Sequence, residues 1–159
     1  MAERAVTVEV RLAHHATAEL VDALNRLVPQ LSSSAAALTS DDVAAMIESP
    51  ATHLFVATSN GAVVGTLTLV TFSIPSGGRA WIEDVIVDEA IRGRGVGEAL
   101  TMAALDEARR CGVRTVDLTS RPSRVAANAL YQKLGFVARE TNVYRFLIES
   151  SANTSSNKV

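Results

Sequence analysis

The sequence has very little cysteine. Cys111 is the one cysteine among 159 residues, which excludes both an intrachain disulfide and a cysteine-cluster metal site. The histidines, His14, His15 and His53, are not spaced along the chain as metal ligands are. Cys111 also lies where a helix is predicted to end, and the helix dipole disfavours a thiolate there. We therefore expect no metal and no catalytic thiol. A chain with a single cysteine also fits a reducing compartment best.

Long apolar runs and an excess of positive charge are also missing. No apolar run approaches the roughly 18 residues of a membrane span, and the first residues lead into an alternating segment without an apolar signal region. The 15 Lys and Arg residues against 17 Asp and Glu give a net charge of −2, which argues against a general nucleic-acid binder. These absences predict a cytoplasmic protein whose partners include neither nucleic acid nor a membrane.

Aromatic residues are scarce as well. They make up 4% of the chain, while hydrophobic residues make up 48%, so the core must be filled mainly by aliphatic side chains. A chain of 159 residues with this composition is long enough for one well-buried core. We expect a single domain over residues 1–149 and a polar, disordered tail over residues 150–159.

The spacing of apolar residues predicts strands and helices in mixed order. Asn60-Gly61 is typical of a hairpin turn, Thr39 and Asp42 have the spacing of a capping box, and Pro29 is expected to end a helix. This order predicts an α/β fold, an α+β mixed sheet of about seven strands with helices on both faces. The expected strands cover residues 6–11, 54–58, 62–72, 80–87, 115–119, 136–137 and 143–148, the expected helices cover residues 17–28, 39–48, 95–111 and 123–134, and a loop is expected over residues 73–79.

A glycine-rich turn separates the strand at residues 80–87 from the long helix that follows. Its backbone N–H groups and the positive end of the helix dipole can bind phosphate, with added charge-assisted hydrogen bonds from arginine. The alternative is a simple tight turn with solvated arginines. Two other phosphate motifs are excluded, because Glu98 stands where a dinucleotide fingerprint needs glycine and the chain has no Gly-Lys pair. The turn consists of Arg92, Gly93, Arg94, Gly95, Val96 and Gly97.

Three segments, in this order, resemble the GNAT N-acetyltransferase superfamily. They are the strand 81–88, the turn 92–97 and the helix segment 127–136, which contains a Leu-Tyr-x-x-x-Gly-Phe pattern. The resemblance implies the GNAT acyl-CoA N-acyltransferase fold and acetyl-coenzyme A (acetyl-CoA) as co-substrate. In this superfamily the co-substrate lies where two neighbouring parallel strands, here 80–87 and 115–119, splay apart.

The resemblance also implies which residues contact acetyl-CoA. The backbone of Val85, Ile86 and Val87 would hold the pantetheine arm, and the glycine-rich turn would bind the pyrophosphate. Asn128 would form a hydrogen bond to the co-substrate. The chain departs from the common family pattern at Arg124, which stands in the place of an asparagine.

Acetyl transfer to an amine needs a group that removes a proton, because an alkylamine with a pKa of about 10.4 is mostly protonated at neutral pH. Glu83 and Asp84 are neighbouring carboxylates in an apolar strand. We expect Glu83 to be the base and Asp84 to bind the substrate amine or to be structural. Side chains alternate between the two faces of a strand, so Glu83 and Val85 lie on the same face and Asp84 on the other unless a bulge intervenes. Because a bulge would change this, the choice between the two carboxylates stays open. The alternative is that they are solvated or pair with Arg79 or Arg114.

Tyr131 resembles the tyrosine that, in many members, donates a proton to the departing thiolate of coenzyme A. Its alternative role is that of a tyrosine at the edge of the core, since it has helical spacing with Leu130 and Leu134. With no catalytic thiol expected, direct attack by the amine in a ternary complex is favoured. A backbone N–H near Val85 would then stabilise the acetyl oxygen as it becomes negative.

The leading hypothesis is an N-acetyltransferase that acts on a small-molecule or peptide amine. A narrower hypothesis comes from the segment 82–85, which resembles the strand of glucosamine-phosphate N-acetyltransferases. A third is a non-catalytic acyl-CoA-binding regulatory module. GNAT sheets often pair, so a homodimer is a further expectation, while the motifs do not identify the acceptor amine.

Overall fold

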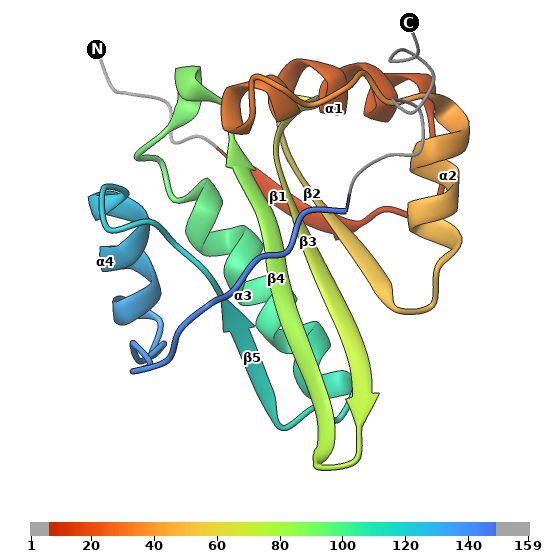
Figure 1. Ribbon diagram of the computed structural model, residues 1–159. Helices are drawn as coiled ribbons and strands as arrows, with labels where there is room; N and C mark the ends of the chain where they lie inside the picture. Colours follow the sequence, from red (N-terminus) through yellow and green to blue (C-terminus); the bar gives the residue numbers. More distant parts are fainter. Residues whose placement is uncertain (1–6, 149–159) are drawn as a thin grey trace, which may run out of the picture.

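The computed structural model describes residues 7–148, which form one five-stranded sheet with helices around it (Figure 1). Neighbouring strands are antiparallel, except that β4 and β5 are parallel. In sheet order the strands are β1 (Val8–Leu12), β2 (Thr52–Ser59), β3 (Ala62–Ile74), β4 (Gly77–Val87) and β5 (Thr115–Leu118). The helices are α1 (Ala18–Leu31), α2 (Ser40–Glu48), the short 3-10 helix η1 (Glu89–Ile91), α3 (Val96–Arg110) and α4 (Val125–Lys133).

Helices cover both faces of the sheet, as predicted. The side chains of β2 alternate between two hydrophobic clusters: Phe55 and Ala57 join α3, whereas Leu54 and Val56 join α1 and α2. In α3, Leu100 is fully buried against the sheet, and burial of a leucine stabilises a fold by about 1.5–3 kcal/mol. The mixed α/β class is therefore confirmed. On its face of the sheet, α3 packs against residues of several strands in one hydrophobic cluster.

Two predicted local signals are confirmed. At α2, the Thr39 hydroxyl accepts a hydrogen bond from the Asp42 N–H at 3.2 Å, and the Asp42 carboxylate accepts one from the Thr39 N–H at 2.8 Å. These bonds form the predicted capping box. Between β2 and β3, Asn60 and Gly61 have φ of 49° and 80°, the left-handed conformations that a two-residue hairpin requires.

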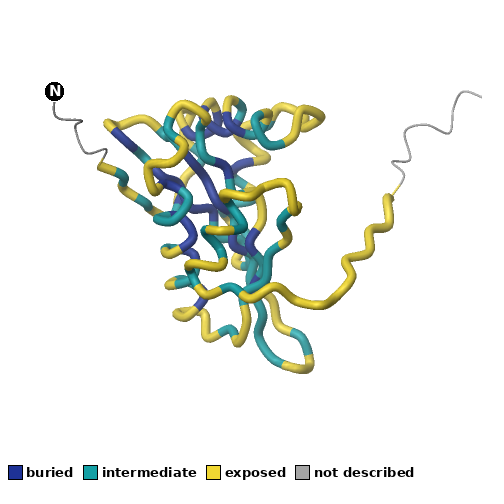
Figure 2. The backbone as a smooth tube through the Cα atoms, turned by 90° about the vertical axis from the view of Figure 1, so that its left-hand side faces the viewer, coloured by how far each residue is buried: buried dark blue, intermediate teal, exposed yellow. Residues whose placement is uncertain are grey.

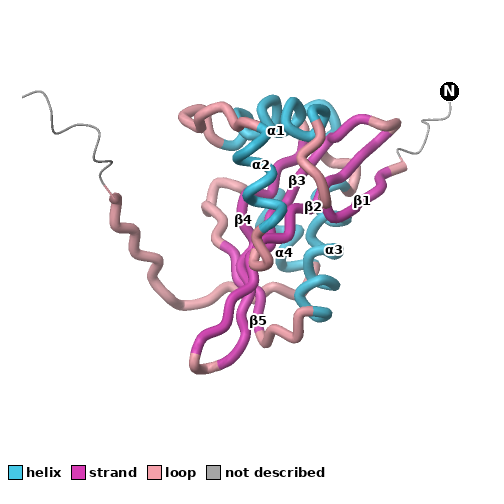
Figure 3. Tube along the Cα trace, turned by 90° about the vertical axis from the view of Figure 1, so that its right-hand side faces the viewer, coloured by secondary structure: helices cyan, strands magenta, loops and turns pink. Residues whose placement is uncertain are grey.

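Two predicted element boundaries are wrong. α1 does not end before Pro29 but continues to Leu31, and the Ser32 N–H still donates to the Val28 carbonyl at 3.0 Å. A proline in the last turn removes only one helical hydrogen bond, so the helix can continue past it. The expected loop at residues 73–79 is instead the end of a long β3–β4 hairpin, whose turn lies at the bottom of Figures 1 and 3.

The predicted hairpin of residues 136–137 and 143–148 is also wrong. α4 ends at Lys133, and the predicted glycine, Gly135, follows the C-cap Leu134 with a left-handed φ of 94°; residues 136–148 then run on without strand pairing. Phe136 still packs against the hydrophobic cluster around α3, whereas the later part of the segment stands away from the sheet in Figures 2 and 3. An apolar run indicates a segment that could pair, but it does not specify a partner strand. Several large apolar side chains here are exposed, namely Val137, Val143, Tyr144, Phe146, Leu147 and Ile148.

The described part of the chain therefore has five strands rather than about seven. Of the expected first strand, Val6 lies outside the described residues, as does the expected tail at 150–159. None of the helices in residues 7–148 combines the length and the hydropathy that a membrane crossing requires.

Candidate active site

β4 and β5 separate in the middle of β4. Their parallel pairing runs from Arg79 opposite Thr115 to Ile82 opposite Leu118, where β5 ends. β4 continues to Val87 and remains paired with β3 on its other side. One edge of β4 is therefore free of β5 from residue 83 to residue 87, in the segment for which a pantetheine contact is expected.

A β-bulge lies at the point where the two strands separate. Thr68 pairs with Glu83 and Thr66 with Ile86, so one residue of β3 stands opposite two of β4. Asp84 has a φ of 47°, a left-handed conformation that is uncommon for a residue with a side chain but most tolerated by Asn and Asp. The bulge that the alternation argument left open is therefore present.

The bulge changes which side chains of β4 share a face. Ile82 belongs to the cluster around α3, and after the bulge Val85 and Val87 pack against that same cluster. Glu83, next to Ile82, is exposed. Regular alternation predicted that Glu83 and Val85 lie on the same face of β4. This prediction is wrong, because the extra residue of the bulge shifts the alternation of side chains by one position.

Both carboxylates of the bulge are exposed, and the two expected arginine partners are engaged elsewhere. Arg79 donates to Asp117 at 2.6 Å, and Arg114 donates to the Ser76 carbonyl at 3.0 Å. Within residues 7–148, neither Glu83 nor Asp84 forms a side-chain ion pair. Both remain available to an incoming amine.

The glycine-rich turn follows β4 and opens α3. Gly93 and Gly95 have φ of 76° and 82°, and no atom lies within 4 Å of the position a Cβ would take in either. Gly95 is the N-cap of α3, and no side chain caps the N–H groups of the first helical turn. These N–H groups and the positive end of a 15-residue helix can therefore bind an anion.

The two arginines of the turn have different surroundings. The Arg92 guanidinium donates to the Val87 carbonyl at 3.2 Å, which links the turn to the end of β4. Arg94 lines a surface hollow together with residues of the β2–β3 turn, among them Asn60. Asp88 also lines this hollow, and a hydrogen bond from the Ala90 N–H is the main cause that lowers the pKa of its carboxyl.

Two contacts hold α4 against the N-terminal turn of α3. A Cβ on Gly97 would lie 3.4 Å from a methyl group of Leu130, so glycine there lets the two helices approach closely. Lys133 donates to both carboxylate oxygens of Glu98, at 2.8 and 2.9 Å. Tyr131 lies between these contacts in the sequence and is thereby kept on the helix next to the glycine-rich turn.

Tyr131 is half-buried, and its ring packs edge-to-face on Phe136 with 5.7 Å between centroids. Burial raises the pKa of the Tyr131 hydroxyl, and the charge of Arg124 opposes this rise only in part. The phenol is therefore protonated at neutral pH and able to donate. Asn128, one turn earlier, donates from its side chain to the Arg121 carbonyl at 3.0 Å and so orders the loop before α4.

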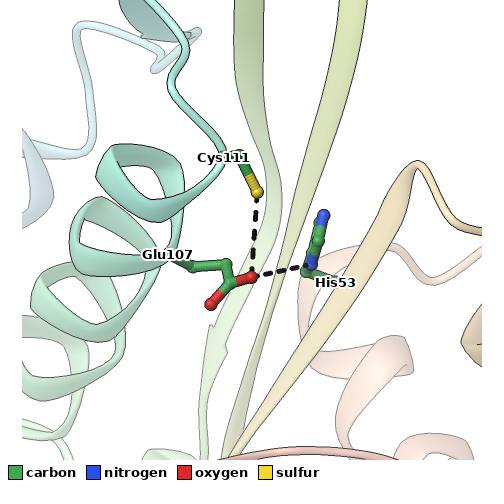
Figure 4. Close-up of side chains that lie close together, drawn as sticks. All are labelled: His53, Glu107 and Cys111. Atoms are coloured by element: carbon green, nitrogen blue, oxygen red, sulfur yellow. Dashed lines mark hydrogen bonds and ion pairs between the residues drawn. The ribbon is translucent and has the colours of Figure 1, made fainter.

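Sequence reasoning missed two features. The Ser120 hydroxyl oxygen, just beyond β5, is buried and has no hydrogen-bond partner among the described residues. His53, Glu107 and Cys111 also form a cluster at the far end of α3 (Figure 4). The four-residue spacing of Glu107 and Cys111 on a helix was a visible signal for the second feature. His53 belongs to β2 and joins them only in the folded chain.

Residues 19–136 of the chain match the acetyltransferase (GNAT) family. Because this match covers most of the chain, the protein belongs to the GNAT acetyltransferase family, as the three sequence segments predicted. A structure of a protein from Agrobacterium tumefaciens strain C58 is 31% identical and superposes with a TM-score of 0.74, over 89% of this chain and 99% of that one.

Two similar proteins have names that state a substrate. The chain is similar to the glucosamine 6-phosphate N-acetyltransferase of Trypanosoma brucei brucei, with 38% identity over 92 residues, 56% of this chain and 60% of that protein. It is also similar to the mycothiol acetyltransferase of Amycolatopsis mediterranei strain U-32, with 44% identity over 57 residues, 36% of this chain and 19% of that protein. The chain thus spans less than two thirds of either relative.

Proposed function

We propose that the protein is an acetyl-CoA-dependent N-acetyltransferase that acetylates a primary amine of a small molecule or peptide. The observation that carries this proposal is the separation of β4 from β5 directly before the glycine-rich turn. It leaves a free strand edge between two exposed carboxylates and an uncapped helix N-terminus. From Glu83 to Val87 the strand spans roughly 13 Å, a length comparable to a pantetheine arm.

The chain's own groups fit this co-substrate. The backbone at Val85, Ile86 and Val87 has an edge not paired with β5 and would pair with the pantetheine amides. The turn of Arg92, Gly93, Arg94, Gly95, Val96 and Gly97 would bind the pyrophosphate through its N–H groups and guanidinium groups. Bound acetyl-CoA supplies an acetyl group activated as a thioester. Asn128 has its side-chain oxygen left to accept a hydrogen bond from the co-substrate.

Glu83 is proposed to take the proton from the acceptor amine, directly or through water, with Asp84 positioning that amine. Both are exposed at the bulge, next to the point where the thioester would lie. The neutral amine would then attack the acetyl carbonyl, and a β4 N–H near Val85 would stabilise the negative charge on the oxygen. The alternative exchanges the two roles between Glu83 and Asp84.

Tyr131 is proposed to protonate the departing thiolate of coenzyme A. The place of Tyr131 on the helix next to the glycine-rich turn supports this role, and its hydroxyl, whose pKa is raised by burial, carries the proton that a general acid must donate. Direct attack needs no enzyme nucleophile. Cys111 is at the opposite end of α3, and its thiol pKa is raised by burial and by Glu107, which also argues against a covalent acetyl intermediate on this residue.

A glucosamine-phosphate acceptor is the second candidate. Its support is the similarity to the trypanosomal enzyme together with the two carboxylates of segment 82–85, a type of side chain that can contact sugar hydroxyl and amino groups. A cytoplasmic location and a homodimer remain predictions.

The test is a panel of amines, each incubated with the protein and acetyl-CoA, with free thiol release as the readout. The panel contains polyamines, amino acids, aminoglycosides, peptide N-termini and glucosamine 6-phosphate. Turnover of one class above the rate without acceptor supports the proposal and identifies the substrate. If acetyl-CoA raises the melting temperature but no amine is turned over, the non-catalytic binding module is the correct function. If acetyl-CoA does not bind, both are wrong.

A further inference from the structure

A cluster of three metal-binding side chain types lies at the C-terminal end of α3, outside the proposed active site. His53 comes from β2, Glu107 from the last turn of α3, and Cys111 is the residue that ends this helix. Figure 4 shows the Glu107 carboxylate between the imidazole and the thiol. From this geometry we propose that His53, Glu107 and Cys111 bind one Zn²⁺ ion, through Nδ1, Oε1 and Sγ.

The distances within the cluster suit a tetrahedral ion. His53 Nδ1 lies 3.5 Å from Glu107 Oε1, and Cys111 Sγ lies 3.7 Å from the same oxygen. All three atoms lie within 4.8 Å of one another. Zinc bonds of about 2.0–2.3 Å place tetrahedral ligands about 3.4–3.6 Å apart. The two separations to Glu107 Oε1 are already close to these values, and the third, between His53 and Cys111, is at most 4.8 Å.

The surroundings position the ligands as metal sites require. A histidine ligand usually uses its second ring nitrogen for a hydrogen bond, and His53 Nε2 lies 3.4 Å from the Thr71 hydroxyl. Arg110 pairs with Glu107 Oε2 and leaves Oε1 facing the other two groups. The side chains of His53 and Glu107 are 14% and 15% exposed, whereas Cys111 is at the surface, so the site is sheltered but has an entrance.

The chemistry of the donor atoms favours Zn²⁺ over a hard cation. One imidazole, one carboxylate and one thiolate form a ligand set typical of zinc, while calcium and magnesium prefer oxygen alone. The carboxylate and the thiolate together neutralise the two charges of the ion. Binding forms the S–Zn bond and releases the thiol proton to solvent, so no oxidant or reductant is involved. A water molecule would complete the fourth position.

The experiment uses the full chain without a histidine tag, stripped with a chelator, and Co²⁺ as a spectroscopic probe. We expect one equivalent of Co²⁺ to produce a thiolate-to-cobalt charge-transfer band together with the visible bands of a tetrahedral site. Zn²⁺ should abolish both by displacement. Cys111→Ser should lose the charge-transfer band, and His53→Gln and Glu107→Gln should each weaken affinity more than 100-fold, beyond the 10–100-fold typical of supporting residues.

Matched controls separate this site from adventitious binding. His15→Gln removes an exposed histidine outside the cluster, and Asp106→Asn removes the exposed acid next to Glu107 in the sequence; both variants should bind the probe as the unaltered chain does. Thr71→Val should weaken affinity 10–100-fold. Circular dichroism checks that each variant is folded, and Cys111→Ser, at an exposed position, keeps the test valid should His53→Gln unfold.

Three results would overturn the proposal. One is the absence of a charge-transfer band with the unaltered chain. The second is an affinity that is the same in Cys111→Ser and the unaltered chain. The third is that the two control variants lose as much affinity as the ligand variants. Any of them would leave the cluster as a hydrogen-bonded contact between β2 and α3.

Discussion

The two ends of α3 are built in opposite ways. At the N-terminal end, a contiguous turn exposes backbone groups: Gly95 is the N-cap, and no atom lies near the place of its missing Cβ. At the C-terminal end, side chains from β2 and α3 converge on the carboxylate of Glu107. With 15 residues at about 1.5 Å each, the helix keeps the two ends roughly 22 Å apart.

This difference decides what sequence reasoning can find. The N-terminal site lies within one short stretch of residues, so its chemistry can be read before the fold is known. The C-terminal site needs the contact between β2 and α3, which depends on the order of strands in the sheet. A local pattern therefore predicts the first site, whereas the second is a product of tertiary structure. The following predictions test whether the two ends also act independently.

The largest effect is expected from Tyr131→Phe. The ring and its packing on Phe136 remain, so the melting temperature and acetyl-CoA affinity should change little. Turnover should fall about 10²- to 10⁴-fold, the usual contribution of a general acid. Cys111→Ser, at the other end of α3, is the control and should keep full turnover. A normal rate in Tyr131→Phe would show that the thiolate leaves without an enzyme acid.

Glu83→Gln should reduce turnover by about 10²-fold at neutral pH, the lower end of general-base effects, because it removes the proposed base and keeps the shape of the side chain. The loss should shrink as pH rises, since more of the acceptor amine is then neutral without help. Rates of Glu83→Gln and Asp84→Asn across a pH series check this. If only Asp84→Asn shows the pH-dependent loss, the base is Asp84.

Gly95→Ala and Gly112→Ala compare the two ends directly. Both glycines have a left-handed φ, 82° and 68°, and both have open space around the missing Cβ. Each alanine should therefore lower the free energy of unfolding by a similar amount, about 1–2 kcal/mol. Acetyl-CoA at a hundredfold excess over its Kd should stabilise the unaltered chain by about 2.7 kcal/mol.

Only Gly95→Ala should lose most of that stabilisation, because only Gly95 lies in the turn proposed to bind the pyrophosphate. Thermal melts with and without acetyl-CoA measure the difference. Equal ligand stabilisation in both variants would mean that the N-terminal turn is a simple tight turn and not a binding site.

Lys133→Ala should have the smallest effect. The pair with Glu98 is largely exposed, at 65% and 40%, so its contribution to stability should be only about 0.2–1 kcal/mol and should decrease with salt. The packing of Leu130 on Gly97 should keep α4 in place. Urea melts at low and high salt measure this contribution, and a loss well above 1 kcal/mol would show that the ion pair, not the packing, holds α4.

The sequence predicted local features well and long-range pairing poorly. The capping box of Thr39 and Asp42, the Asn60-Gly61 turn and the glycine that follows the end of α4, Gly135, depend on neighbours within a few residues, and all are present. Residues 143–148 have the composition of a strand, but pairing also needs a partner, and the structure provides none in the described residues. Composition alone could not decide this.

The candidate site shows the same limit. The glycine-rich turn and α4 occupy the expected places in the chain, while the bulge could only be left open, because register depends on how β3 pairs with β4. Ser120 was missed because nothing in its surrounding sequence indicates that its hydroxyl is buried without a partner. Which residues touch acetyl-CoA stays a prediction until binding is measured.

The left-handed backbone of Asp84 has a consequence for engineering this protein. Glycine would hold the same φ at lower conformational energy, so substitution there is an obvious route to a more heat-resistant chain. It would also delete one of the two carboxylates at the strand separation. With the proposed role of Asp84 in positioning the amine, stability and chemistry compete at a single residue, and attempts to raise heat resistance are better directed to positions remote from the bulge.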